Sequence, residues 1–381
     1  MTTEFIQKII RYFVILLLFI CLWNIVSLQD RIAQQYFLQL GIMIIFGLLL
    51  KNIWLTLFLW WTVFLFCFYK FNLGQEYLGN VYTGLMLYYL VKVGFKKEHI
   101  TFFINAVLWV CFVNLVYMFC QVLNWDFVYR LQLISSKGLE GYASNNEPAG
   151  FMGFKACMGI LMALCVPLLA SRGNLSAKIA CIGLFLPLYL AKSSICVTGA
   201  IIGLLFVLWY QLKKIKWALI VIGLILGAFF YVWKVDMPMN MMPTRLSQWK
   251  MTLQDCILHP VTGWGLDSFR KITEQKKHLY VIDPVKKDDG SMGFSLWDNP
   301  HNMYISLFFE WGILGLFLLG GYLRQCGIWF QRAIKEPNVI ALTGFGLVVL
   351  IVSIAQFPFW LSRTVTIIVP AFALFEVAVR S

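Results

Sequence analysis

The sequence predicts an all-α integral membrane protein with about twelve transmembrane helices and a large external loop between helices 9 and 10. The 381 residues are 60% hydrophobic and only 13% charged. An ordinary soluble domain carries about 25% charged residues, so this chain has too little polar surface for a water-soluble globule. A helix needs roughly 20 mainly apolar residues to cross a bilayer, and apolar runs near that length recur throughout the sequence.

The apolar runs divide the chain into three parts. Residues 1–233 hold the first nine helices, residues 234–301 form the external loop, and residues 302–381 hold the last three helices. The first run follows Lys8 and Arg11 as a signal peptide would, but it lacks a good small-residue cleavage site, so we expect an uncleaved span. The expected spans lie near residues 12–27, 36–50, 52–69, 77–93, 100–123, 149–170, 177–191, 195–211, 217–233, 302–322, 338–356 and 362–378.

Basic residues occur in alternate loops, which predicts the orientation. If the N-terminus is cytoplasmic, every internal loop is short and carries Lys or Arg, as the positive-inside rule requires. Both termini are then cytoplasmic, the longer segments 124–148 and 234–301 are external, and we expect the active site on the external, periplasmic side of the plasma (inner) membrane. The internal basic residues are Lys51, Lys92, Lys96, Lys97, Arg172, Lys178, Lys213, Lys214, Lys216, Arg324, Arg332 and Lys335.

The net charge of +13 does not indicate nucleic acid in this context. The bilayer headgroups and anionic lipid-linked substrates are the expected counter-charges. The ten cysteines fall mainly in apolar runs, where they act as small hydrophobic residues. Asp288 and Asp289 give only a weak metal pattern, and no nucleotide-binding, serine-hydrolase or zinc motif occurs. We therefore expect neither a metal nor a cofactor.

The external loop contains a helical pattern of its own. Leu246, Trp249, Leu253 and Ile257 recur at helical spacing within residues 244–258. Such a helix can lie along a membrane surface, and we expect Arg245 and Lys250 on its polar side.

His301 and Glu310 are candidate functional residues at the point where the loop re-enters the membrane. Histidine exchanges protons near neutral pH, which suits His301 to a base in an external cavity. An interfacial histidine without chemical function fits the same position equally well. Glu310 lies about 12 Å further along the same helix, where an acid is costly unless it is paired or functional. A structural ion pair is the favoured explanation for Glu310, with substrate binding as the alternative.

Four other residues are candidates for holding an anionic substrate. A forked guanidinium at Arg245 can hold phosphate oxygens while Trp249, one turn later, stacks on a sugar; headgroup contact and anchoring are the alternative. Arg270 adds positive charge to the same loop, although part of the loop's charge simply belongs to a solvent-exposed face. Lys155 lies within the sixth predicted span, where a lysine more often snorkels to the surface. Lys192 lies at the external end of the seventh span.

Three segments together resemble the O-antigen ligase and O-antigen polymerase superfamily, which includes bacterial O-oligosaccharyltransferases. The family pattern is an Arg with a Trp shortly after, a Pro-x-x-Gly-x-Gly turn, and a His-Asn pair opening a helix that carries a Glu and two glycines. All elements occur here in order. They are Arg245 and Trp249, then Pro260 to Gly265 with Trp264, then His301 and Asn302, then Glu310, Gly312 and Gly315. The number of spans and the late external loop also match.

The resemblance implies transfer of a saccharide from a polyprenyl-diphosphate carrier to a hydroxyl of a glycan, lipid or protein acceptor, in surface polysaccharide biosynthesis. It implies that His301 is the base or positions the acceptor, and that Arg245 holds the diphosphate. Family members often carry a Ser-Arg pair near the external end of a middle span. The matching place here reads Lys192-Ser193-Ser194, so Lys192 takes the place of the arginine without its bidentate fork.

Two other classes of function stay open on the sequence. About twelve spans is also common among transporters of small or lipid-linked solutes, although no repeat relates the two halves of this chain. A lipid-carrier binding partner without catalysis is the third possibility, because the family arginine is absent. Within the transferase class, the sequence does not separate a polymerase, a ligase and a protein-directed transferase.

Overall fold

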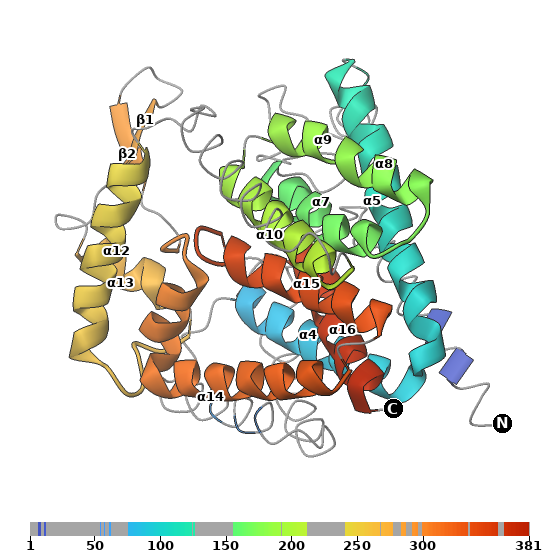
Figure 1. Ribbon diagram of the computed structural model, residues 1–381. Helices are drawn as coiled ribbons and strands as arrows, with labels where there is room; N and C mark the ends of the chain where they lie inside the picture. The colour runs from blue at the N-terminus through green and yellow to red at the C-terminus, as the bar shows by residue number, and fades with distance from the viewer. Residues whose placement is uncertain are drawn as a thin grey trace.

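The computed structural model is built mainly of helices and carries one short two-stranded hairpin in its described part (Figure 1). The expected spans at 12–27, 36–50, 52–69 and 217–233 lie wholly or largely outside the described residues. The structure describes residues 7–8, 11–12, 54, 57, 61, 75–123, 125, 155–191, 193–211, 241–266, 268–276, 283–286, 292–295, 299–333, 336–356 and 362–380.

In the described part of the chain, seven helices lie where apolar runs predict spans. Three described helices are long and apolar enough to cross a membrane, namely the helix over Lys97–Val122, Ser194–Gln211 and Met303–Ala333. Shorter apolar helices accompany them, and the chain is a multi-pass membrane protein. The seven helices are α4 (Gln75–Gly94), α5 (Ile100–Val122), α7 (Lys155–Ala170), α10 (Ser194–Gln211), α14 (Met303–Ala333), α15 (Pro337–Val352) and α16 (Ser362–Arg380); a 3-10 turn, η2 (Lys97–His99), precedes α5.

The expected span at 177–191 is divided. The chain forms α8 (Leu175–Gly183) and α9 (Phe185–Leu190), with Leu184 between them. Pro187 explains the division, because it has no amide hydrogen to bond the Gly183 carbonyl and its ring crowds that carbonyl. Leu184 itself has helical backbone angles, with φ of −67° and ψ of −20°, so Leu175–Leu190 remains one apolar helical segment with a local break in its hydrogen bonding.

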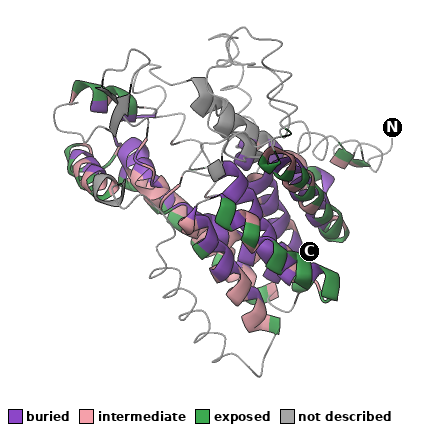
Figure 2. Ribbon diagram, turned by 90° about the horizontal axis from the view of Figure 1, so that it is seen from above, coloured by how far each residue is buried: buried purple, intermediate pink, exposed green. Residues whose placement is uncertain are grey.

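The core lies between α7, α10 and α15, which run side by side in the centre of the fold (Figure 1). Figure 2 shows that buried residues gather in the central helices. Every residue of α7 from Cys157 to Leu168 is buried. Small residues bring the helices together: a Cβ on Gly203 of α10 would lie 2.6 Å from a Val348 methyl, and one on Gly344 of α15 would lie 2.8 Å from Pro167. Close approach at small residues is the usual way in which membrane helices pack.

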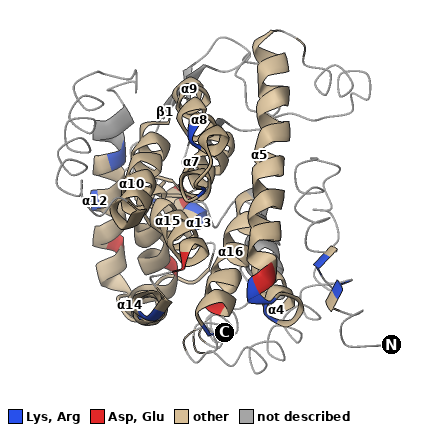
Figure 3. Cartoon of the chain, turned by 45° about the vertical axis from the view of Figure 1, so that its right-hand side comes forward, with Lys and Arg blue, Asp and Glu red and all other residues tan. Residues whose placement is uncertain are grey.

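A buried carboxylate joins α4 to α16. Glu376 is inaccessible to solvent and lies 2.9 Å from the Lys92 ammonium and 2.7 Å from the Arg380 guanidinium. The Tyr88 hydroxyl donates a further hydrogen bond to the same carboxylate. These charges lie near the end of α4 and the C-terminus, whereas most of the helical surface is uncharged (Figure 3). The pairing offsets the cost of burying an acid among apolar helices.

The loop 234–301 contains α12 (Met241–Leu258), α13 (Phe269–Gln275) and an antiparallel pair of strands, β1 (Asp283–Lys286) and β2 (Met292–Ser295). The helix predicted over 244–258 is therefore confirmed, whereas the hairpin was not expected. α12 lies at one edge of the fold, alongside the first part of α14 (Figure 1).

Candidate functional site

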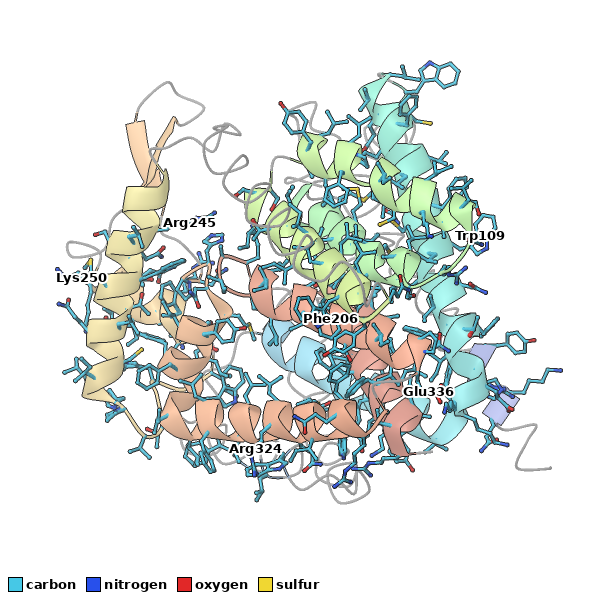
Figure 4. All side chains as sticks on the ribbon, in the orientation of Figure 1. Trp109, Phe206, Arg245, Lys250, Arg324 and Glu336 are labelled. Atoms are coloured by element: carbon cyan, nitrogen blue, oxygen red, sulfur yellow. The ribbon has the colours of Figure 1, made fainter. Side chains whose placement is uncertain are left out.

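The polar face of α12 is turned towards the protein. Gln248, Thr252 and Asp255 are buried, whereas Leu246, Leu253 and Ile257 are exposed. Arg245 is partly buried and Lys250 points away from the fold (Figure 4). The two residues do not share the outer face as expected, because five residues along an α-helix correspond to a rotation of about 140°. Arg245 therefore belongs to the interior side of the helix.

Arg245 reaches from α12 to the end of α15. Its guanidinium donates a hydrogen bond of 3.4 Å to the Ala355 carbonyl, just beyond the last residue of that helix. Carbonyls at a helix C-terminus carry partial negative charge and attract cations. This contact fixes the guanidinium in the space between α12, α15 and the start of α14.

Trp249 links α12 to the segment that carries His301. The indole nitrogen donates a hydrogen bond of 2.6 Å to the Pro300 carbonyl. This hydrogen bond occupies the polar atom of the indole, so any sugar contact at Trp249 has to use the face of the ring.

His301 has a left-handed backbone conformation, with φ of 50°. Its amide donates a hydrogen bond of 2.9 Å to the Asn299 side chain. Asn302 follows as the cap of α14, and its side-chain oxygen accepts a hydrogen bond of 3.0 Å from the Ile305 amide. The Met303 amide is bonded to the Ser353 carbonyl at 2.9 Å. A non-glycine residue at positive φ is uncommon and is held here by these flanking bonds.

The imidazole of His301 is neutral at pH 7. Burial, and secondly the positive charge of Arg245, lower its pKa from 6.5 to about 4. The charge interaction places the Arg245 and His301 side chains in the same electrostatic environment. The site therefore combines a permanent cation with an uncharged imidazole ring.

The segment from Pro260 to Gly265 packs into a break in α14. The helix is interrupted at Gly312, whose φ is 68°, and the Ile313 amide donates a hydrogen bond of 2.8 Å to the Pro260 carbonyl. A Cβ on Gly263 would lie 2.5 Å from the Phe309 carbonyl oxygen. These glycines therefore have a structural function, since they let two backbones meet and so fix α12 against α14.

Trp264 is part of the same packing. Its amide is bonded to the Phe309 carbonyl at 2.7 Å, and its indole donates to the Asp255 carbonyl at 2.9 Å. The Lys276 ammonium lies 5.3 Å from the indole centroid and 2.5 Å from the Asp255 carboxylate. These contacts give Trp264 a role in joining α12, α13 and α14, and its predicted contact with substrate stays a prediction.

The remaining candidates are dispersed. Glu310 is buried two residues before the break in α14, inside the protein. Arg270 is exposed on α13 and forms an ion pair with Glu274 at 3.1 Å, which is a solvated arrangement. Lys155 is the first residue of α7, and its side chain lies outside the described part of the chain, as does all of Lys192. The structure thus brings together Arg245, Trp249, Asn302 and His301.

Two residues near these groups were not singled out from the sequence. Gln248, one turn after Arg245, and Ser306, in the first turn of α14, are each 2% exposed. Within the described part of the chain, neither the Gln248 Oε1 nor the Ser306 Oγ has a hydrogen-bond partner. Leaving such an atom buried costs about 1–3 kcal/mol, which marks both as candidate ligand groups. The only signal in the sequence is the helical spacing of Gln248 from Arg245.

One comparison with known proteins covers this site. Residues 157–320 match the protein family described as O-antigen ligase. The matched range runs from α7 through α12 and the turn from Pro260 to Gly265 to the first half of α14. It therefore includes Arg245, Trp249, His301 and Gly312. This match confirms the resemblance that the ordered motifs predict. No curated protein matches the chain.

Proposed function

Because the region that holds Arg245 and His301 is similar to the O-antigen ligase family, we propose that this protein is a membrane glycan transferase. It moves a saccharide from a polyprenyl-diphosphate carrier to an acceptor hydroxyl on a glycan, lipid or protein. The reaction takes place on the external face of the plasma membrane, where the positive-inside rule puts the loop 234–301.

The observation that carries the proposal is the packing of α12 against the segment of His301: Trp249, one turn after Arg245, donates a hydrogen bond of 2.6 Å to the Pro300 carbonyl, next to His301. The acceptor oxygen forms a bond to the anomeric carbon, the bond from that carbon to the diphosphate oxygen breaks, and the bond electrons leave with the diphosphate. Arg245 stabilises the charge on the leaving group, and His301 accepts the proton of the acceptor hydroxyl. Direct displacement of this kind inverts the anomeric centre and involves neither a metal nor a covalent enzyme intermediate.

The lowered pKa of His301 is compatible with this role once substrate is bound. An anionic diphosphate beside Arg245 offsets the guanidinium charge, which is the second cause of the lowered pKa. Substrate binding therefore raises the pKa of His301 towards neutrality and makes the imidazole a stronger base when the acceptor is present.

Trp249, Asn302, Trp264 and Glu310 support this centre. Trp249 and Asn302 position the His301 segment through the bonds described above, Trp264 stabilises the contact between the Pro260–Gly265 turn and α14, and Glu310 stays a candidate for substrate binding. Lys155, Lys192 and Arg270 are retained as candidates for binding more distant parts of the anionic substrate.

The test is the surface glycan profile of cells in which the gene is intact, deleted, or restored with His301→Ala or Arg245→Ala. Both variants should reproduce the deletion while remaining in the membrane at the parent's level. Lys271→Ala, which removes an exposed cation of the same loop, is the matched control and should restore the parent profile.

The profile also discriminates between the classes. Loss of long chains with single repeats still attached indicates a polymerase, and loss of attached glycan with carrier-linked chains accumulating indicates a ligase or protein transferase. A normal profile from both His301→Ala and Arg245→Ala contradicts the proposed roles. Substrate-dependent flux in proteoliposomes without a covalent product favours a transporter.

A further inference from the structure

The outer face of α12 is an apolar stripe, which is the reverse of what a helix in a water-exposed loop presents. Leu246 is 54% exposed, Leu253 41% and Ile257 71%. These residues and Lys250 follow each other at intervals of four, three and four residues, so they form one row along the helix. The polar residues Gln248, Thr252 and Asp255 are buried on the opposite side.

The stripe continues onto α14. Val261, in the turn that follows α12, is 57% exposed, and the neighbouring Pro260 carbonyl is bonded to the Ile313 amide at 2.8 Å. Ile313 and, one turn later, Phe317 are also exposed, on a helix long and apolar enough to span a membrane. Exposed apolar residues are therefore found on α12, on the turn that follows it and on the adjoining part of α14.

The environment of α14 identifies what covers α12. Ile313 and Phe317 are exposed on a membrane-spanning helix and face hydrocarbon, and the Phe317 ring also packs edge-on against Trp54, with 5.9 Å between the ring centroids. Val261 adjoins this helix, because a Cβ on Gly312 would overlap the Val261 carbonyl. Lys250 is the single cation of the stripe, and its long stem allows the ammonium to reach lipid headgroups while its methylenes stay in apolar surroundings.

We propose that the α12 stripe, defined as Leu246, Lys250, Leu253, Ile257 and Val261, is a docking surface for the phospholipid bilayer that α14 crosses. The helix lies in the interface with its leucine and isoleucine side chains in the acyl region. Arg245 is on the inward side of the same helix, so docking fixes the guanidinium at the depth of the phosphate groups.

The proposal is tested by site-specific crosslinking in the full-length chain. A photoreactive benzoylphenylalanine replaces Leu246, Leu253 or Ile257, and the protein is reconstituted in vesicles of phosphatidylethanolamine and phosphatidylglycerol. Phe317 on the membrane span is the positive control, and Lys271 on the exposed side of α13 is the negative control. After illumination, the mass of the intact protein reports what has been attached.

The expected result is a phospholipid adduct at Leu246, Leu253, Ile257 and Phe317, with at least a fivefold lower yield at Lys271. Adducts at Phe317 but none at the three α12 positions would overturn the proposal and place the stripe in water. Protein dimers at those positions would overturn it in favour of a second copy of the chain. The readout does not involve glycan transfer, so its failure is separable from failure of the proposed function.

Discussion

Gly263 and Gly312 occupy backbone space that no side chain can share. Each has φ of 68°; a Cβ on Gly312 would overlap the Val261 carbonyl, and one on Gly263 would lie 2.5 Å from the Phe309 oxygen. Two motif segments separated by about fifty residues in the sequence therefore meet through their main chains. This contact fixes α12, and with it Arg245, relative to α14.

Gly312→Ala should destabilise the protein strongly, because the new methyl group both overlaps the Val261 carbonyl and strains a left-handed backbone. We expect the melting temperature in detergent to fall by about 5 °C or more, which in a chain of this length corresponds to a loss of roughly 2–4 kcal/mol. Gly320→Ala, in the same helix, has open space around its Cβ and should leave the melting temperature unchanged or raise it. An equal effect of both substitutions would contradict the proposed main-chain contact between the two motif segments.

Arg245→Ala should raise the pKa of His301 above about 4, because one of the two causes of its lowering is removed. Burial remains, so the pKa should stay below 6.5. Titration of the histidine ring signals by NMR, with His301→Gln used to assign the resonance, measures the change. Lys271→Ala is the matched control and should not move the signal. An unchanged pKa of His301 in Arg245→Ala would show that the Arg245 charge does not act on the His301 ring.

The pKa of His301 also predicts how stability depends on pH. The folded pKa of about 4 lies below the unfolded value of 6.5, so the unfolded state binds the proton more readily. The stabilising contribution of the neutral ring is complete above pH 6.5 and is lost as the pH falls towards 4. Between pH 7 and pH 5 the parent should therefore lose more thermal stability than His301→Gln, as measured by melting temperature. A parallel decrease in both proteins would contradict this assignment.

Trp249→Phe should lower transfer activity with little effect on folding. The variant keeps the aromatic packing but loses the hydrogen bond to the Pro300 carbonyl, which holds the segment before His301. We expect a decrease in turnover of about tenfold, since small displacements of a catalytic group are costly. Trp109→Phe, on an exposed face of α5, is the control in the same assay and should retain parent activity.

Gln248→Leu tests whether the buried amide serves a ligand. An apolar side chain of similar size removes a buried oxygen that lacks a partner in the described part of the chain, so the melting temperature should stay constant or rise. Transfer activity should fall if the amide binds substrate. Gln254→Leu, on the exposed side of the same helix, is the control, and full activity in Gln248→Leu would assign the amide a packing role alone.

Much of the helical architecture follows from apolar patterning, because length and hydropathy decide which segments can span a bilayer. The ranges expected near 195–211 and 338–356 agree with α10 and α15 within a few residues. α14 ends at Ala333, beyond its expected end at 322. Hydropathy located only the most apolar part of this helix, and the helix continues past that part. Pro187 carried the signal for the division of 177–191, but Pro167 and Pro370 lie within continuous helices, so proline alone does not predict a break.

The site was less accessible to sequence reasoning. His301 and Arg245 were identified from their chemistry and their order in the motif. Which side of α12 is buried depends on the tertiary contact with α14, since both sides of this helix carry large apolar or aromatic residues. The left-handed conformation of His301 and the contact between Arg245 and Ala355 likewise require segments that are distant in the sequence to meet.

The ion pair between Lys92 and Glu376 has a consequence for biogenesis. The two residues are 284 positions apart, so a ribosome that has produced α4 must translate most of the remaining chain before the carboxylate for Lys92 exists. Glu376 has a partner on its own helix, Arg380, and gains Lys92 and Tyr88 when α16 packs against α4. The complete set of partners that offsets the cost of this buried acid therefore forms only when the last helix has been synthesised and has joined α4.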